Sequence, residues 1–448
     1  MGLSVAYSSS AVVLLLAVAT IVLLLVFEDE SSQLSRTLVD YFPSSSSPSS
    51  SSAFVQHQTD GESSQLESDL VDLTLVEGAA EKDAVCLDGS LPAYHLRRGF
   101  GSGKRNWLIH MEGGGWCSSD LSCAQRSQTS LGSSKHMARQ ILFSGILSMS
   151  PSLNPDFYNW NQVKIRYCDG ASFSGDVDSD LVPSGVRNAQ HIHYRGQKLW
   201  QAVIGDLLHR GLADADKALL SGCSAGGLAA ILHCDKFQKF LPKKATVKCL
   251  SDAGYFLDVQ DISGNYSFRS FYEKVIKLQN VQANFPESCD SKDDVTKCFF
   301  PEYLVKDIQT PLFILNPAYD VWQLQNIWIP DSADISKAWN LCKNDPIHCS
   351  EGQIEILQGY RKKLIERLKI VQQKDLWGLF INSCFLHCQS EVDTAWNGLH
   401  APRVNNQTIA ETVGEWFFER KIAQEVDCAY PCNPTCPPWN GWRRKMLK

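Results

Sequence analysis

Short apolar runs alternate with helical stretches through most of this chain. Runs of strand length occur at residues 107–110, 163–167, 219–221, 246–250, 312–315 and 378–381. Between the second and the third run, the pairs Leu199-Trp200, Val203-Ile204 and Leu207-Leu208 repeat at the spacing of a helix with one buried face. This alternation predicts an α/β fold, a mostly parallel sheet with helices on both faces.

The amino-terminal pattern differs, because residues 11–27 contain no charged side chain and Thr20 as their one polar residue. As a helix this segment would reach about 26 Å, near the short end for spanning a bilayer. The pattern predicts a signal peptide or signal anchor over residues 1–30. Acidic residues 28–30 follow without a small-residue cleavage site, which favours an anchor. No lysine or arginine precedes Arg36 to set its orientation, so both alternatives stay open.

The next segment, residues 31–75, is rich in serine and other polar residues, and residues 44–52 are serine apart from Pro48. Such a composition buries too little apolar surface to order a chain. We therefore expect a disordered linker over 31–75, followed by one large domain over 76–448. That domain holds all 16 cysteines and all 12 tryptophans of the chain.

The cysteines follow an apolar leader, which predicts an oxidising compartment and disulfide bonds. A local bridge between Cys117 and Cys123 fits their spacing, and Cys428, Cys432 and Cys436 resemble a stapled tail. Their pairing does not follow from the sequence. A zinc site in the tail is the alternative, but no histidine stands at ligand spacing.

Charge and sequons bear on partners and processing. The formal net charge of −7 means that the protein as a whole is not attracted to a polyanion. We therefore expect no nucleic-acid partner. Any recognition of an acidic partner would need a local basic groove. N-glycosylation sequons begin at Asn265 and Asn406, which agrees with a secretory route.

One of the apolar runs stops at a serine between small residues, Gly222-Cys223-Ser224-Ala225-Gly226, and then continues as a helical stretch. Strand, sharp turn and helix around G-x-S-x-G predict a nucleophile elbow with Ser224 exposed at its tip. An ordinary glycine-rich turn has the same short pattern, so the assignment depends on the partners of Ser224.

A second glycine-rich stretch, Glu112-Gly113-Gly114-Gly115-Trp116, follows the strand-like run at 107–110. Acyl transfer places negative charge on a carbonyl oxygen, and backbone N–H groups in such a loop can stabilise that charge. We assign the oxyanion donors to Gly114, Gly115 and Ala225. The alternative is a flexible turn, which the position of the loop upstream of the elbow disfavours.

A serine nucleophile needs a histidine base and an orienting carboxylate, which follow it in the order acid, then histidine, in α/β-hydrolases. Asp320 comes directly after the run 312–315, and Asp252 is its rival. His387 follows the run 378–381, and His400 is its competitor.

Taken together, these stretches resemble the plant pectin acetylesterases and the Notum carboxylesterases of the same family. The motifs that carry the resemblance are residues 112–117, 221–227, 316–320, 382–387 and 428–436, and it extends from about residue 85 to the end. It implies a disulfide-rich α/β-hydrolase-like fold with Ser224 as nucleophile, Asp320 as acid and His387 as base.

The resemblance also implies a substrate and a place of action. The substrate would be acetylated pectin (homogalacturonan) of the plant cell wall, hydrolysed at its acetyl esters without metal or organic cofactor. A Notum-like lipid esterase with a long acyl pocket and a non-catalytic cell-wall binding protein remain as alternatives. Trp322 and residues 323–328, next to Asp320, are candidates for the wall of a short acyl pocket, or for core packing.

Overall fold

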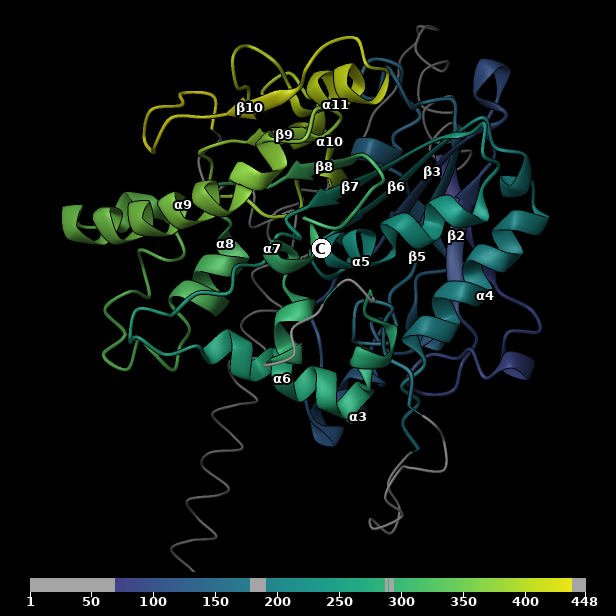
Figure 1. Ribbon diagram of the computed structural model, residues 1–448, viewed down its shortest axis with the longest axis horizontal. Helices are drawn as coiled ribbons and strands as arrows, with labels where there is room; N and C mark the ends of the chain where they lie inside the picture. Colours follow the sequence, from purple (N-terminus) through teal and green to yellow (C-terminus); the bar gives the residue numbers. More distant parts are fainter. Residues whose placement is uncertain (1–68, 178–190, 287–288, 290–293, 437–448) are drawn as a thin grey trace, which may run out of the picture. The chain divides into compact units, whose positions relative to one another are not determined.

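A sheet of ten strands organises the part of the chain that the computed structural model describes, which is residues 69–177, 191–286, 289 and 294–436. The predicted leader and residues 31–68 of the predicted linker lie outside these ranges. The strand order is β10-β9-β8-β7-β6-β3-β5-β2-β1-β4. The strands from β10 to β5 run parallel, and β2, β1 and β4 complete the sheet as antiparallel strands (Figure 1).

The strands are β1 (Leu70–Leu75), β2 (Ala93–Arg97), β3 (Asn106–Met111), β4 (Gln140–Leu142), β5 (Asn161–Ile165), β6 (Lys217–Cys223), β7 (Thr246–Asp252), β8 (Leu312–Leu315), β9 (Gly378–Ile381) and β10 (Gln424–Val426). The helices are α3 (Asp120–Arg126), α4 (Gly196–His209), α5 (Ala225–Phe240), α6 (Ser267–Gln279), α7 (Pro301–Leu304), α8 (Val321–Gln323), α9 (Glu351–Gln372), α10 (Asp393–Trp396) and α11 (Ile409–Phe417). Five of the six predicted apolar runs lie entirely on strands, the run 163–167 extends two residues beyond the end of β5, and the predicted amphipathic repeat is α4.

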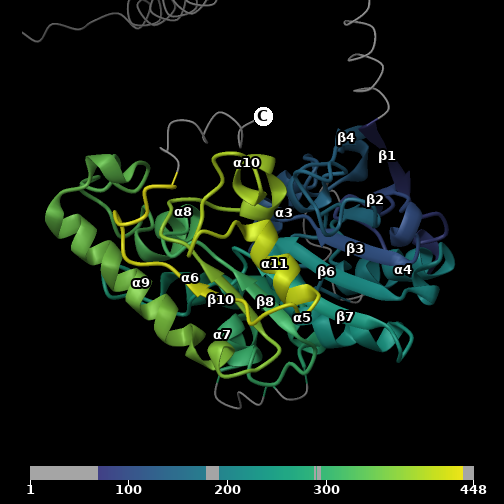
Figure 2. The same ribbon diagram turned by 90° about the horizontal axis from the view of Figure 1, so that it is seen from above.

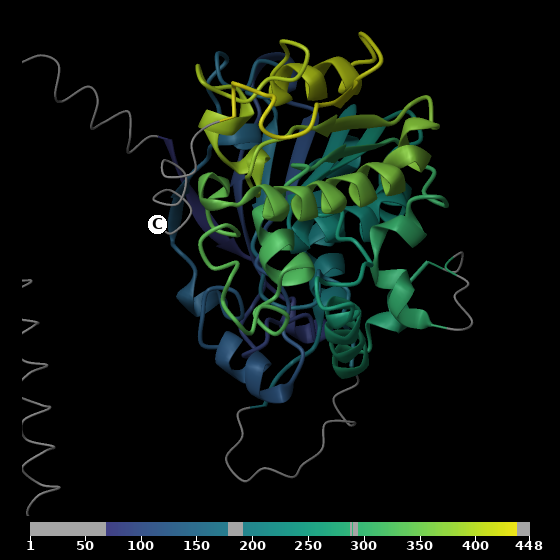
Figure 3. The same ribbon diagram turned by 90° about the vertical axis from the view of Figure 1, so that its left-hand side faces the viewer.

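Alternating side chains on each strand build two cores, one on each face of the sheet. On β3, Trp107 and Ile109 pack in the larger core with α4, α5, α6 and α9, whereas Leu108 packs on the other face with α10 and α11. Figure 1 shows α11 above the strands and α5 below them, Figure 2 looks from above onto α11, and Figure 3 shows α9 across the β8–β10 side. The period of two along the strands thus produces the predicted covering of both faces.

The predicted linker ends too late, because residues 70–75 form β1 and pair with β2 and β4. Val71 is buried in the second core, and the alternation Leu70-Val71-Asp72-Leu73 is that of a strand with one covered face. The serine-rich composition of the preceding residues hides this short run in any long window. The folded domain therefore begins by residue 69 and not at 76.

All 16 cysteines are paired, as Cys86–Cys168, Cys117–Cys123, Cys223–Cys388, Cys234–Cys249, Cys289–Cys298, Cys342–Cys349, Cys384–Cys436 and Cys428–Cys432. The prediction of a disulfide-rich fold is confirmed, including the local Cys117–Cys123 bridge. The tail cysteines are all in disulfides, which leaves no thiolate there for the alternative zinc site. None of the helices in the described ranges combines the length and the hydrophobicity that a bilayer crossing requires.

Candidate active site

The turn between β6 and α5 forces Ser224 into a rare backbone conformation, with φ 58° and ψ −124°. Its N–H donates to the carbonyl of Asp252 at 2.9 Å, which ties the turn to the end of β7. A Cβ at Gly222 or Gly226 would collide with the backbone of the facing element, so only glycine lets strand and helix approach this closely. This is the strand, turn and helix predicted around Ser224.

Asp320 and His387 form a buried pair at the carboxyl ends of two neighbouring strands. Asp320 follows β8 and is fully buried, and its Oδ1 accepts from the N–H of Gln323 at 2.9 Å, which caps α8. The ring Nδ1 of His387 donates to Asp320 at 2.8 Å (Oδ2) and 3.0 Å (Oδ1). With its proton on Nδ1, the neutral ring keeps Nε2 as an acceptor.

A disulfide joins the elbow to the loop that carries the histidine. Cys223 precedes Ser224, Cys388 follows His387, and their Cα atoms are 5.4 Å apart. The two sulfur atoms and a ring nitrogen of His387 all lie within 4.8 Å of one another. The bridge Cys384–Cys436 fixes the other side of the same loop. The bridges thereby hold the His387–Asp320 pair next to the elbow that carries Ser224, while no hydrogen bond joins Ser224 to His387 in the described structure.

Neither rival from the sequence forms a hydrogen bond with the His387–Asp320 pair, although Asp252 lies close enough to His387 for their charges to interact. Asp252 ends β7, fully buried, and its Oδ2 accepts from the N–H and the hydroxyl of Ser390 at 2.6 and 2.7 Å. Burial raises the pKa of Asp252 to about 7. Its hydrogen bonds go to the loop after His387 and not to the imidazole, so it supports the loop. His400 lies exposed after α10.

Three carboxylates set the charge of the imidazole. Burial disfavours its charged form, but the attraction of Asp320, its hydrogen bond to Nδ1, and the charges of Asp252 and Glu391 outweigh burial. Together they raise the pKa of His387 above its ordinary 6.5.

A polar network that no sequence pattern predicted includes Ser221 of β6, the strand that leads to the elbow. The Glu391 carboxylate accepts from Lys164 at 2.9 Å and pairs with Nε2 of His110 at 3.1 Å. The other ring nitrogen of His110 is 2.9 Å from the hydroxyl of Ser221 on β6. Burial opposes ionisation of Glu391, but Lys164 and His110 hold its pKa well below the usual range. The network connects the histidine loop to β3, β5 and β6.

The triple-glycine loop lies against the nucleophile. A Cβ built at Gly113 would come 2.8 Å from Cβ of Ser224, so the loop backbone touches the elbow. Within the described ranges, the N–H groups of Gly114, Gly115 and Ala225 have no acceptor in the protein. Free N–H groups beside a serine are what an oxyanion requires, and these are the three predicted donors.

A cluster of aromatic rings lies beside His387. Trp322 is partly buried and stacks near the imidazole, with 6.3 Å between ring centroids. It packs edge-on against Trp116 at 5.7 Å and Phe256 at 5.5 Å, and Trp116 also meets Tyr272 at 5.0 Å. By contrast, Leu324, Ile327 and Trp328 are buried in the core, so the segment 323–328 serves mainly packing.

Comparison with known proteins places these features in a family. The family model described as Pectinacetylesterase matches residues 64–437. "Pectin acetylesterase 5" of Arabidopsis thaliana is 48% identical over 82% of this chain and 85% of its own length. "Pectin acetylesterase 11" of the same plant is 49% identical over 82% of this chain and 93% of its own length.

More distant matches share the fold. "Palmitoleoyl-protein carboxylesterase NOTUM" of Mus musculus is 27% identical over 79% of this chain and 70% of its own length. The solved structure of the Wnt deacylase Notum from Drosophila superposes with a TM-score of 0.67 at 24% identity, covering 82% of this chain and 99% of that one. The expected α/β-hydrolase-like fold is therefore confirmed.

Proposed function

Since the chain belongs to the pectinacetylesterase family, whose members are carboxylic ester hydrolases, we propose that it removes acetyl groups from pectin with Ser224, His387 and Asp320 as its triad. The observation that supports the triad most directly is the Asp320–His387 hydrogen bond in a loop disulfide-bonded to the elbow. Identity of 48% to pectin acetylesterases, against 27% to a Notum protein, favours the acetyl substrate over a lipid. An assembled pair of this kind also disfavours a non-catalytic binding protein.

The geometry supports a two-step hydrolysis. Nε2 of His387 takes the proton of the Ser224 hydroxyl as its oxygen attacks the acetyl carbonyl, and Asp320 stabilises the imidazolium that forms. The N–H groups of Gly114, Gly115 and Ala225 hold the oxyanion. The sugar alcohol leaves with the proton from His387, and water repeats the sequence on the acetyl-enzyme.

Acyl length distinguishes this proposal from a lipid esterase. On matched aryl esters we expect kcat/KM to be highest for acetate and to fall at least about tenfold by octanoate, because we propose that Trp322, packed against Trp116 and Phe256, forms the wall of a short acyl pocket. A lipid esterase would instead gain about 0.8 kcal/mol for each CH₂ that it buries. The measurements are initial rates on the ester series and acetate release from acetylated pectin. Rates that climb to octanoate, together with no acetate from pectin, would contradict the proposal.

The enzyme acts in the cell wall after passing through the secretory route. Sixteen paired cysteines require an oxidising compartment, and the apolar segment 11–27 serves as the targeting signal for the secretory route. The domain is exported whether the segment is a cleaved signal peptide or an uncleaved signal anchor. The length of the segment favours the anchor. We therefore expect amino-terminal sequencing of membrane-bound protein to read from before residue 27. A soluble mature protein that begins beyond residue 30 would mean a cleaved signal peptide.

A further inference from the structure

The glycine loop is held between two elements. On one side, Gly113 touches Ser224 at the elbow. On the other, a Cβ at Gly114 would lie 2.8 Å from the side chain of Leu131 and 3.3 Å from Nη2 of Arg126. A Cβ at Gly115 would enter open space. The loop thus has the nucleophile on one side and Arg126, the last residue of α3, on the other.

The Arg126 side chain binds the main chain of this loop. Its Nη1 donates to the carbonyl of Gly114 at 2.9 Å, and its Nε donates to the carbonyl of Leu131 at 2.8 Å. The guanidinium lies over the ring of Tyr167, 4.9 Å from its centroid. The hydroxyl of Tyr167 in turn donates to the carbonyl of Gly115 at 2.8 Å. Two successive peptide groups of the loop are therefore fixed by Arg126 and by the ring it covers.

These contacts determine where the free N–H groups point. In a planar trans peptide, the C=O of Gly114 and the N–H of Gly115 point in opposite directions. Because Arg126 holds the Gly114 carbonyl, the N–H of Gly115 is aimed away from α3. That N–H has no acceptor among the described residues, which keeps it available for an oxyanion.

The charge of Arg126 is not neutralised by a direct partner. No carboxylate of the described residues forms an ion pair with it, although the buried Asp169 carboxylate lies within range of its charge, and the Nη2 of Arg126 is buried without an acceptor there. A cation bonded to a carbonyl polarises the whole peptide group and makes the attached N–H a stronger donor. Arg126 therefore orients the Gly114–Gly115 peptide group and polarises it with its positive charge.

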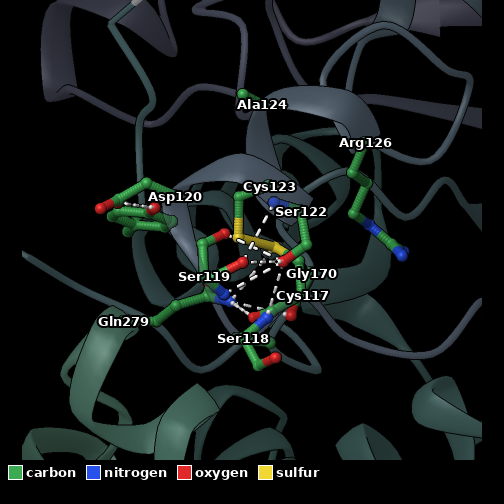
Figure 4. Close-up of a disulfide and its surroundings, with 12 residues drawn as sticks. Cys117, Ser118, Ser119, Asp120, Ser122, Cys123, Ala124, Arg126, Gly170 and Gln279 are labelled. Atoms are coloured by element: carbon green, nitrogen blue, oxygen red, sulfur yellow. Dashed lines mark hydrogen bonds between the residues drawn. A yellow bond between two sulfur atoms is a disulfide. The ribbon is translucent and has the colours of Figure 1, made fainter. Parts of the chain in front are cut away.

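A rigid frame keeps Arg126 in place. Figure 4 shows the Cys117–Cys123 disulfide, which ties the end of the glycine loop to α3, and the Arg126 side chain extending from that helix. The N–H of Cys117 donates to Gly170 at 3.1 Å, and the Gln279 amide donates to the carbonyls of Cys117 and Gly170 at 2.9 and 3.0 Å. The helix and the loop are consequently held together by a covalent bond and shared hydrogen bonds.

We propose that Arg126 is a positioning residue of the esterase reaction, which orients and polarises the Gly114–Gly115 peptide so that the Gly115 N–H stabilises the oxyanion. The inference rests on the proposed function only as far as serine esterase chemistry with this oxyanion loop. Arg126 makes no hydrogen bond to the proposed triad and acts on the transition state through the main chain of the loop.

The test compares Arg126→Met and Arg126→Lys with the wild type on an aryl acetate. Methionine keeps the aliphatic stem over Tyr167 but neither bonds the Gly114 carbonyl nor carries charge, so we expect kcat to fall about 10- to 100-fold with KM changed less than about threefold. Lysine restores one charged donor and should recover part of the loss. The inhibition constant of a phenylboronic acid, which mimics the tetrahedral adduct on Ser224, should rise by the same factor as kcat falls.

Arg105→Met is the matched control, because Arg105 forms an exposed ion pair with Asp216 before β3, and its loss should leave kcat unchanged. Wild-type kcat in Arg126→Met, or a raised KM with unchanged kcat, would overturn the inference.

If thermal melting shows that Arg126→Met does not fold, the Arg126→Lys variant becomes the test, since lysine keeps the size and the charge of the side chain. A lower kcat at unchanged KM in that variant supports the inference, and unchanged kcat rejects it. Failure of the wild type on acetylated pectin would reject the proposed substrate but leave the aryl acetate and boronate results valid.

Discussion

Replacing Ser224 by alanine should lower kcat for acetate release by roughly 10⁴- to 10⁶-fold. The reason is that the hydroxyl supplies the bond-forming oxygen, and neither His387 nor the oxyanion loop can replace it. The fold should survive, because the Ser224 side chain makes no hydrogen bond to another described residue and both alanine and serine meet the same backbone constraint at φ 58°.

The measurement is acetate release from acetylated pectin, together with labelling by a serine-directed fluorophosphonate and a thermal melt. Ser270→Ala, on the exposed side of α6, is the matched control and should keep full activity and labelling. More than about one per cent residual kcat in a folded Ser224→Ala protein would remove Ser224 from the proposed role.

The second large effect concerns the carboxylate. Asp320→Asn should lower kcat by roughly 10⁴-fold, because an amide beside Nδ1 no longer favours the tautomer that leaves Nε2 free to accept a proton. Asp252→Asn should cost less than about tenfold, since the asparagine oxygen can still accept from Ser390. A larger loss in Asp252→Asn than in Asp320→Asn would make Asp252 the acid of the triad.

The pH dependence of kcat/KM is expected to differ between the wild type and Asp320→Asn. His387 must be neutral to act as a base, and its pKa is raised by Asp320, Asp252 and Glu391 against the effect of burial. The acid limb of the wild-type kcat/KM profile should therefore lie above pH 6.5. Without the Asp320 charge the imidazole loses its proton more easily, so the limb of the residual activity should move to lower pH. A flat wild-type profile from acid to neutral pH would count against histidine as the base.

Local patterns in the sequence were sufficient to predict the parallel sheet and the three residues of the proposed triad. Ser224, Asp320 and His387 each follow a short apolar run, and a run of that kind marks a strand whether or not its partners are known. The antiparallel strands were missed because β1 and β4 bury one residue between them and only the first three residues of β2 are buried. Their hydrophobic signal is weak, and their pairing depends on residues distant in the sequence.

The supporting residues of the site could not have been predicted in this way. Glu391 meets Lys164 across 227 positions and His110 across 281, and the fold alone brings such groups together. Arg126 lies closer in sequence, 12 positions after Gly114, but an arginine at a helix end ordinarily reads as a solvated side chain. Only the direction of the Gly114 carbonyl reveals its role.

The disulfide between Cys223 and Cys388 closes a covalent ring of the intervening chain, with the proposed nucleophile and base just inside its two ends. A protease that nicks an exposed turn in this ring, for instance near Ile335 or Ile347, opens the ring but does not divide the molecule. The two fragments stay joined beside Ser224 and His387, and only a reducing agent separates them. The ring therefore makes the proximity of these two residues independent of an unbroken backbone between them.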